Sequence, residues 1–89
     1  MKFKDLYISR VDRFSVGIEE QLGVYYLSIP VSNGFVDYEE YYEVDPNALE
    51  EIARNYNGFL KTVEACRNRK MDHHLLVKPG KKEVILFNG

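Results

Sequence analysis

The sequence predicts an α+β fold, with an N-terminal three-stranded antiparallel meander packed by two helices and followed by a C-terminal hairpin or short strands. Apolar and polar residues alternate over residues 14–44, which is typical of strands that bury one face. Asn33-Gly34 divides this stretch with a pair that favours tight hairpin turns. Asp45-Pro46 then opens a segment whose apolar residues recur at helical spacing.

The 89 residues predict a single domain, 1–89, because a chain of this length rarely builds two cores. The hydrophobic share of 45% and the charged share of 29% are ordinary for a globular protein. The net charge of −2 hides an asymmetry along the chain. Residues 12–45 contain eight acids and one base, whereas residues 54–82 contain eight bases and two acids. The predicted meander is therefore acidic and the C-terminal half is basic.

The central hairpin is predicted in detail. We expect a four-residue loop, Ser32 to Phe35, because a shorter loop would place Pro30, which has no N–H, at a hydrogen-bonding ladder position. Leu27 then faces Glu40, and this pair lies on an otherwise apolar face. The other expected pairs of that face are Val31 with Val36, Ile29 with Tyr38, and Tyr25 with Tyr42.

The strand before this hairpin is predicted to pair so that its apolar residues join the same buried face. The expected partners are Phe14 with Ile29, Val16 with Leu27, and Ile18 with Tyr25. For residues 3–11 the pattern leaves two alternatives open, a further strand or an irregular lead-in.

Two helices are expected after the meander. Asp45 is predicted as the N-cap and Pro46 as the first helical residue, and Asn57-Gly58 is predicted to end or kink this helix. A second helix should end in the region 67–70. Beyond it, residues 74–77 and 83–87 are predicted to form a hairpin or two short strands around the turn 78–81.

The first candidate site is the polar face of the hairpin. Strand alternation places acids and tyrosines on one exposed side, where they could attract a basic protein and hold it through aromatic contacts. The alternative is a solvated strand face with no binding role. The candidate partner-binding residues are Tyr26, Asp37, Glu39, Tyr41 and Glu43.

The second candidate is Glu40, which the same alternation directs toward the core. A buried carboxylate is costly unless it is paired, so Glu40 with Tyr38 or Tyr42 could line a ligand-binding or catalytic cleft. The alternatives are a bulge that turns Glu40 outward, or an ion pair with Arg13 or with a base from a helix.

Other chemical groups carry little signal. His73-His74 would point to opposite faces of a strand and no third ligand is evident, so we expect no metal site. Cys66 lies on an apolar helical stripe, which favours a small core residue over a nucleophile. The bases from Arg67 to Lys82 favour a solvated helix end over a nucleic-acid site. We expect no cofactor, and the sequence favours a binding protein over an enzyme without excluding catalysis.

The expected compartment is the cytoplasm. No apolar run approaches the ~20 residues that cross a bilayer, and the first residues lack a signal-peptide pattern, so we expect no membrane association. Cys66 is the only cysteine, which excludes an intramolecular disulfide and fits a reducing environment.

The segment Tyr25–Tyr42 resembles a stretch found in a group of small uncharacterised bacterial proteins, where a helical part ending like Ala65-Cys66-Arg67 follows. The resemblance covers roughly Val16 to Val77 and implies no activity that can be transferred to particular residues. In size and acidity the chain is also similar to the immunity proteins that bacteria pair with contact-dependent toxins. That similarity implies an inhibitor that binds a toxin.

Together these observations favour a cytoplasmic bacterial protein-binding module, an immunity- or antitoxin-like inhibitor that engages a basic partner through its acidic, tyrosine-bearing strand face. A small-ligand-binding protein or minor enzyme using the Glu40 cleft is the alternative. A structural homodimer formed through an exposed edge strand is the third hypothesis.

Overall fold

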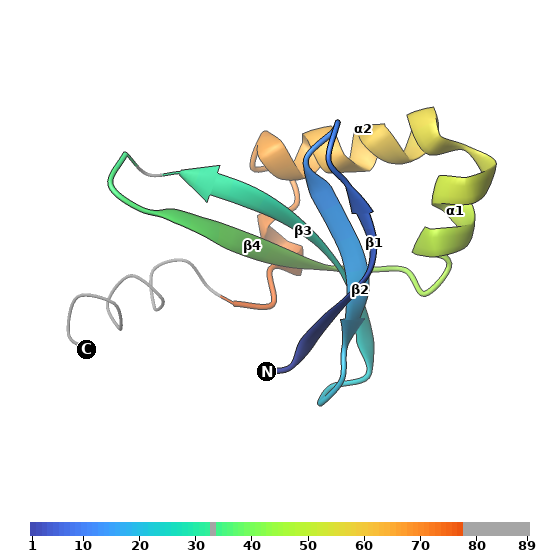
Figure 1. The fold of residues 1–89 in the computed structure, drawn as a ribbon, viewed down its shortest axis with the longest axis horizontal. Coiled ribbons are helices and arrows are strands. Elements are labelled where there is room, and N and C mark those ends of the chain that lie inside the picture. The colour runs from blue at the N-terminus through green and yellow to red at the C-terminus, as the bar shows by residue number, and fades with distance from the viewer. Residues whose placement is uncertain (33, 78–89) are drawn as a thin grey trace.

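The computed structural model describes residues 1–32 and 34–77, which form an α+β fold with two helices on one face of an antiparallel sheet (Figure 1). The sheet has four strands in the order β1-β2-β3-β4, one more than the predicted meander. The elements are β1 (Phe3–Ser9), β2 (Phe14–Glu19), β3 (Val24–Ser32), β4 (Asp37–Val44), α1 (Ala48–Arg54), α2 (Tyr56–Arg67) and a 3-10 turn (Asp72–His74).

The pairing of β2 with β3 confirms the predicted register, with Val16 opposite Leu27. Between β3 and β4 the register lies two residues from the prediction, so that Leu27 faces Tyr42 and Ile29 faces Glu40. Because side chains alternate with a period of two, a shift of two leaves every residue on its predicted face. Ser32 pairs with Asp37, so the connecting loop has the predicted length of four residues but begins one residue later.

β1 resolves the alternatives left open for residues 3–11 in favour of a strand. It pairs with β2, and the register shifts between Asp5 and Tyr7, so that Leu6 is an extra residue in the strand. Gly17 of β2 allows a close approach of β1 and of a side chain from β3. A Cβ atom at this position would lie 2.0 Å from the Lys4 carbonyl oxygen of β1 and 2.6 Å from the Tyr26 hydroxyl of β3. The N-terminal half of β1 therefore lies close to Gly17 and to the Tyr26 side chain.

The core lies between the sheet and the helices. Its members are buried apolar side chains that alternate along β2, β3 and β4 and recur at helical spacing in α1 and α2. Cys66 is among them, as predicted, and burial raises the pKa of its thiol to about 12. The core residues are Phe14, Val16, Leu27, Ile29, Tyr42, Ala48, Ile52, Phe59, Val63, Cys66 and Leu75.

The helix boundaries correct two predictions. The first helix begins at Ala48 and not at Pro46, because Asp45 forms a turn in which its Oδ1 accepts the Asn47 N–H at 2.8 Å. The break between the helices falls at Asn55 (φ −150°, ψ 71°), whose side chain accepts the Gly58 N–H at 3.1 Å. Asn57-Gly58 thus lies in the first turn of α2. The predicted end of the second helix near Arg67 is confirmed.

The segment after α2 returns to the free edge of β4. His74 lies in the 3-10 turn and not in a strand, so the argument that adjacent histidines face opposite sides was wrong. Leu75 forms an isolated bridge with Tyr42, and the Leu76 N–H donates to the Tyr41 carbonyl at 2.8 Å. The rest of the predicted C-terminal hairpin, residues 78–87, lies outside the described residues.

Candidate partner-binding surface

The acids predicted on the polar face of the hairpin lie on the side of the sheet opposite the helices. Asp37, Glu39 and Glu43 are all exposed along β4. They alternate with residues that face the core, as a half-buried strand requires. The expectation of exposed acids on this face is therefore confirmed.

The tyrosines of this face are placed differently. Tyr26 is fully buried, so the expectation that it is exposed was wrong, and Tyr41 is half-buried. Phe3 at the start of β1 covers both rings. It stacks on Tyr41 at a centroid distance of 3.7 Å and meets Tyr26 edge-on at 5.2 Å. Tyr26 is thus a packing residue, and Tyr41 is left with only part of its ring at the surface.

The strand β1, whose Phe3 covers Tyr26, also brings a further acid to this face. The Tyr26 hydroxyl donates to Asp5 Oδ1 at 2.5 Å, although Asp5 belongs to the strand at the far edge of the sheet. Sequence reasoning missed Asp5 because the path of residues 3–11 was left open. Gly17 was the available signal, since a glycine inside a strand often marks the close approach of another backbone.

Burial and the nearby acids together raise the pKa values of both tyrosines on this face. The pKa of Tyr41 is raised first by burial and then by the negative charges of Glu39 and Asp5. The pKa of Tyr26 is raised by burial and by its hydrogen bond to Asp5. Both phenols therefore stay neutral at physiological pH. We call the four exposed acids Asp5, Asp37, Glu39 and Glu43 the acidic surface.

Glu40 faces the core, as predicted, and is only 4% exposed. Its Oε1 accepts the Tyr42 hydroxyl at 2.8 Å and pairs with Arg69 Nη1 at 2.5 Å. Arg69 follows the second helix and also contacts Asp72 Oδ2 at 3.2 Å. Among the alternatives, an ion pair is therefore the one observed, but its partner is Arg69, which lies two residues beyond the helix, and not Arg13. This arrangement is a structural ion pair, and it weakens the case for a reactive carboxylate.

The opposite carboxylate oxygen, Glu40 Oε2, has no hydrogen-bond partner in the described part of the chain. Tyr42 donates to the Cys66 carbonyl as well, at 3.3 Å, so the phenol is held between strand and helix. Tyr38, the other candidate cleft residue, shares this strand face and is half-buried. Tyr42 thus links β4 to α2, and Glu40 lies beside it.

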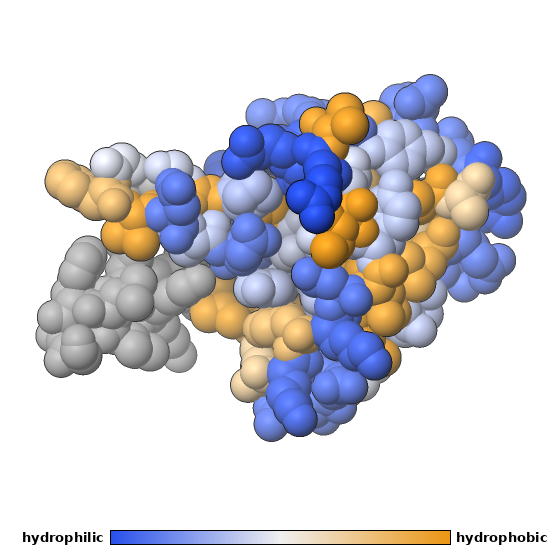
Figure 2. Space-filling model, viewed as in Figure 1, coloured by the Kyte–Doolittle hydropathy of each residue, from blue (hydrophilic) through white to orange (hydrophobic). Residues whose placement is uncertain are grey.

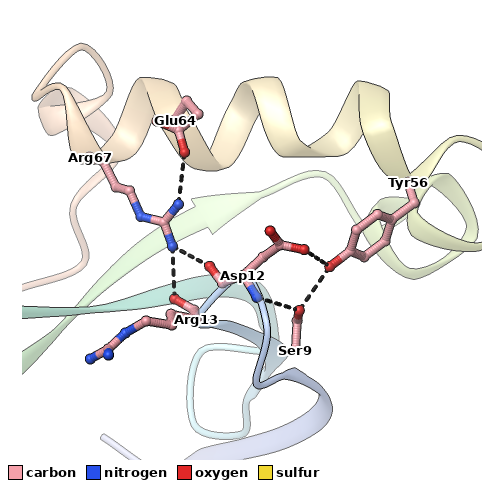
Figure 3. A network of polar contacts seen from close by, with 6 residues as sticks. All are labelled: Ser9, Asp12, Arg13, Tyr56, Glu64 and Arg67. Carbon is pink, nitrogen blue, oxygen red and sulfur yellow. Dashed lines mark hydrogen bonds and ion pairs between the residues drawn. The ribbon is translucent and has the colours of Figure 1, made fainter.

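A second polar network ties the turn between β1 and β2 to α2 (Figure 3). The Tyr56 hydroxyl donates to Asp12 Oδ2 at 2.5 Å and lies 2.8 Å from Ser9 Oγ. Arg67 Nη2 donates to the backbone carbonyls of Asp12 and Arg13, and Arg67 Nη1 pairs with Glu64 at 2.8 Å. Sequence reasoning missed this network because it joins segments more than forty residues apart.

The edge strand β1 exposes apolar side chains, among them Leu6 and Ile8, which are 47% and 57% exposed. Figure 2 shows separate hydrophobic patches between hydrophilic side chains on the visible side of the molecule. The extra residue in β1 and the charges of Lys4 and Asp5 hinder the pairing of this edge with another strand. The geometry therefore gives little support to a homodimer formed through β1.

Neither histidine belongs to a ligand cluster. Their exposed rings lie 4.1 Å apart, and residues 1–32 and 34–77 contain no group of three or more side chains suited to a metal ion.

Within residues 1–32 and 34–77, no helix has the length and apolar character needed to cross a membrane.

Comparison with protein-family models, curated proteins and solved structures finds no match for this chain. Functional inference therefore rests on the geometry of the acidic surface and of the polar networks around it.

Proposed function

We propose that this protein is a binding module that engages a basic protein partner through the acidic surface. The observation that carries the proposal is the convergence of acids from the two opposite edge strands. Phe3 of β1 stacks on Tyr41 of β4 at 3.7 Å, and Asp5 of β1 accepts the Tyr26 hydroxyl at 2.5 Å, so Asp5 lies on the same face as Glu39 although two strands separate β1 from β4. Exposed acids on one face favour a partner of opposite charge.

The expected mechanism is electrostatic steering followed by contact with Tyr41. Exposed carboxylates spaced along a strand create a negative field that attracts a cationic surface before contact. Glu39 and Glu43 are four residues apart, about 13 Å along an extended strand, so they can meet two separate cations. The exposed part of Tyr41 lies between them and supplies apolar contact once the partner has docked.

The particular role that we propose is a cytoplasmic immunity- or antitoxin-like inhibitor in bacteria. An enzyme that acts on nucleic acid presents cations shaped for phosphates, and the carboxylates of the acidic surface can substitute for those phosphates. In this role the protein itself needs no catalytic group. The same chemistry gives no reason for the protein to bind nucleic acid, because its own acids would repel the phosphates.

A small-ligand site or minor catalytic site at Glu40 remains the alternative. The feature that favours it is Glu40 Oε2, which has no hydrogen-bond partner among residues 1–32 and 34–77, since a buried oxygen without a donor is unusual. The ion pair with Arg69 argues against it, because this pair already neutralises the charge that a catalytic carboxylate would need.

Affinity capture with matched charge variants tests the proposal. The purified protein, a face variant (E39K/E43K) and a control variant (E20K/E50K) are used as baits in extract from the cells that make it. Both variants change the net charge by the same amount, and Glu20 and Glu50 are exposed outside the acidic surface. We expect a basic protein that is retained by the wild type and by the control variant but lost by the face variant.

A partner retained equally by all three baits contradicts a role for the acidic surface. A partner lost equally by both variants shows dependence on net charge alone and also contradicts it. Gene order provides an independent check, since a gene for a large secreted toxin beside this one is expected for an immunity protein.

A further inference from the structure

A second feature lies on the same sheet face, at the end nearest the turn between β1 and β2. It is an open groove of about 280 Å³ that combines two cations with an apolar wall. The groove is distinct from the acidic surface except at Glu39, which belongs to both. Its main lining residues are Ile8, Arg10, Arg13, Ser15, Pro30 and Glu39.

The two arginines of the groove are available for a ligand. Arg10 and Arg13 are exposed, and no hydrogen bond or ion pair joins either guanidinium to another residue of ranges 1–32 and 34–77. Elsewhere in the same ranges, Arg67 and Arg69 are both engaged in ion pairs. Two guanidinium groups that line one hollow favour the binding of an anion between them.

The position of Arg13 is held by the rest of the fold. Its backbone has φ 56°, a left-handed conformation that costs an ordinary residue free energy and that glycine adopts freely. Arg67 fixes this conformation by donating to the carbonyl oxygens of Asp12 and Arg13. Figure 3 shows the Arg13 side chain directed away from that network. These two hydrogen bonds thus hold the Arg13 backbone, while the Arg13 guanidinium takes no part in them.

We propose that this groove binds a small monocarboxylate, with its carboxylate on Arg10 and Arg13 and its alkyl chain along Ile8 and Pro30. The planar guanidinium fork matches a carboxylate through paired hydrogen bonds. Glu39 lines the same groove and adds a negative charge, so the three charged residues sum to +1, which is the charge that complements a monoanion. Ile8, 57% exposed, provides the apolar contact that distinguishes a longer alkyl chain from acetate.

NMR titration of the whole chain with acetate, butanoate and inorganic phosphate tests the proposal. We expect butanoate to shift the amide signals of residues around the groove with a millimolar dissociation constant. Acetate should bind more weakly, by about threefold for each methylene that it lacks. Phosphate should bind more weakly than butanoate. The variant R13G should weaken butanoate binding at least about tenfold, because it removes one of two charge-assisted contacts.

The variant R13G separates loss of the site from loss of the fold. Glycine suits the backbone at this position, so its thermal midpoint should equal or exceed that of the wild type. The matched control is R54Q, which removes one exposed cation from α1 and should leave butanoate binding unchanged. The proposal is overturned if butanoate causes no shifts, if R13G and R54Q bind it equally, or if phosphate binds more tightly than butanoate.

Discussion

The ion pair between Glu40 and Arg69 should respond asymmetrically to the loss of each partner. The Glu40 side chain is 4% exposed, whereas the Arg69 side chain is 44% exposed. R69M therefore leaves the buried Glu40 carboxylate without its charged partner, where water cannot reach it. E40Q leaves the Arg69 guanidinium, which can turn toward solvent. We expect R69M to destabilise the protein much more than E40Q, although both break the same contact.

The magnitudes follow from burial. Removing one partner of a fully buried pair costs about 3–5 kcal/mol, and the half-exposed position of Arg69 places R69M near the lower end, about 3 kcal/mol. The contact of Arg69 with Asp72 is half-exposed and accounts for less than about 1 kcal/mol of this. E40Q keeps an acceptor for the Tyr42 hydroxyl and should cost about 1 kcal/mol.

The double variant, E40Q/R69M, should lower the free energy of unfolding by about 2 kcal/mol, because a neutral amide replaces the unpaired buried carboxylate. It should thus be more stable than R69M alone, which gives a coupling of about 2 kcal/mol between the two sites. Urea unfolding at pH 7, followed by circular dichroism, measures all four proteins. Equal losses for R69M and E40Q, or a double variant whose loss is the sum of the single losses, would refute the reasoning.

Three further predictions concern the fold. G17A should cost about 2–3 kcal/mol in urea unfolding, because its methyl group meets the Lys4 carbonyl oxygen; an unchanged midpoint would contradict the close approach of β1. N55A should cost about 1 kcal/mol by removing the N-cap of α2, and equal stability would show that this cap is dispensable. Burial raises the pKa values of Tyr26 and Tyr42 above the ordinary 10.0, so the folded state holds their protons more tightly. The stability that these two phenols contribute should therefore be constant below about pH 10 and be lost above it, and unfolding midpoints that stay level from pH 10 to pH 11 would contradict this.

The sequence predicts what depends on local periodicity. The alternation along residues 14–44 correctly assigns Glu40 to the core and Glu39 to the surface, because side chains on a strand change sides at every residue. The two-residue error in the register between β3 and β4 preserves this assignment, since an even shift leaves the faces unchanged. Local pattern thus determines the face of each residue more reliably than its partner.

The remaining errors arise from contacts between distant segments. Tyr26 is on its predicted face, but Phe3 from a strand twenty-three residues earlier covers it, and no local pattern reveals that cover. The helix break was assigned to Gly58 on propensity, whereas the Asn55 side chain caps the new helix and retains the glycine in its first turn. The partner of Glu40 was also undetermined, because several bases could reach it and only tertiary packing selects Arg69.

The central claim, that the acidic surface engages a basic partner, is tested most directly by association kinetics with the captured protein. The association rate constant of the wild type should fall steeply as salt rises from about 0.05 to 0.3 M, because screening weakens steering. For E39K/E43K it should be at least about tenfold lower at 0.05 M and nearly independent of salt. The control E20K/E50K should keep most of the wild-type salt dependence. Equal rates and equal salt dependence for the wild type and the face variant would contradict the claim.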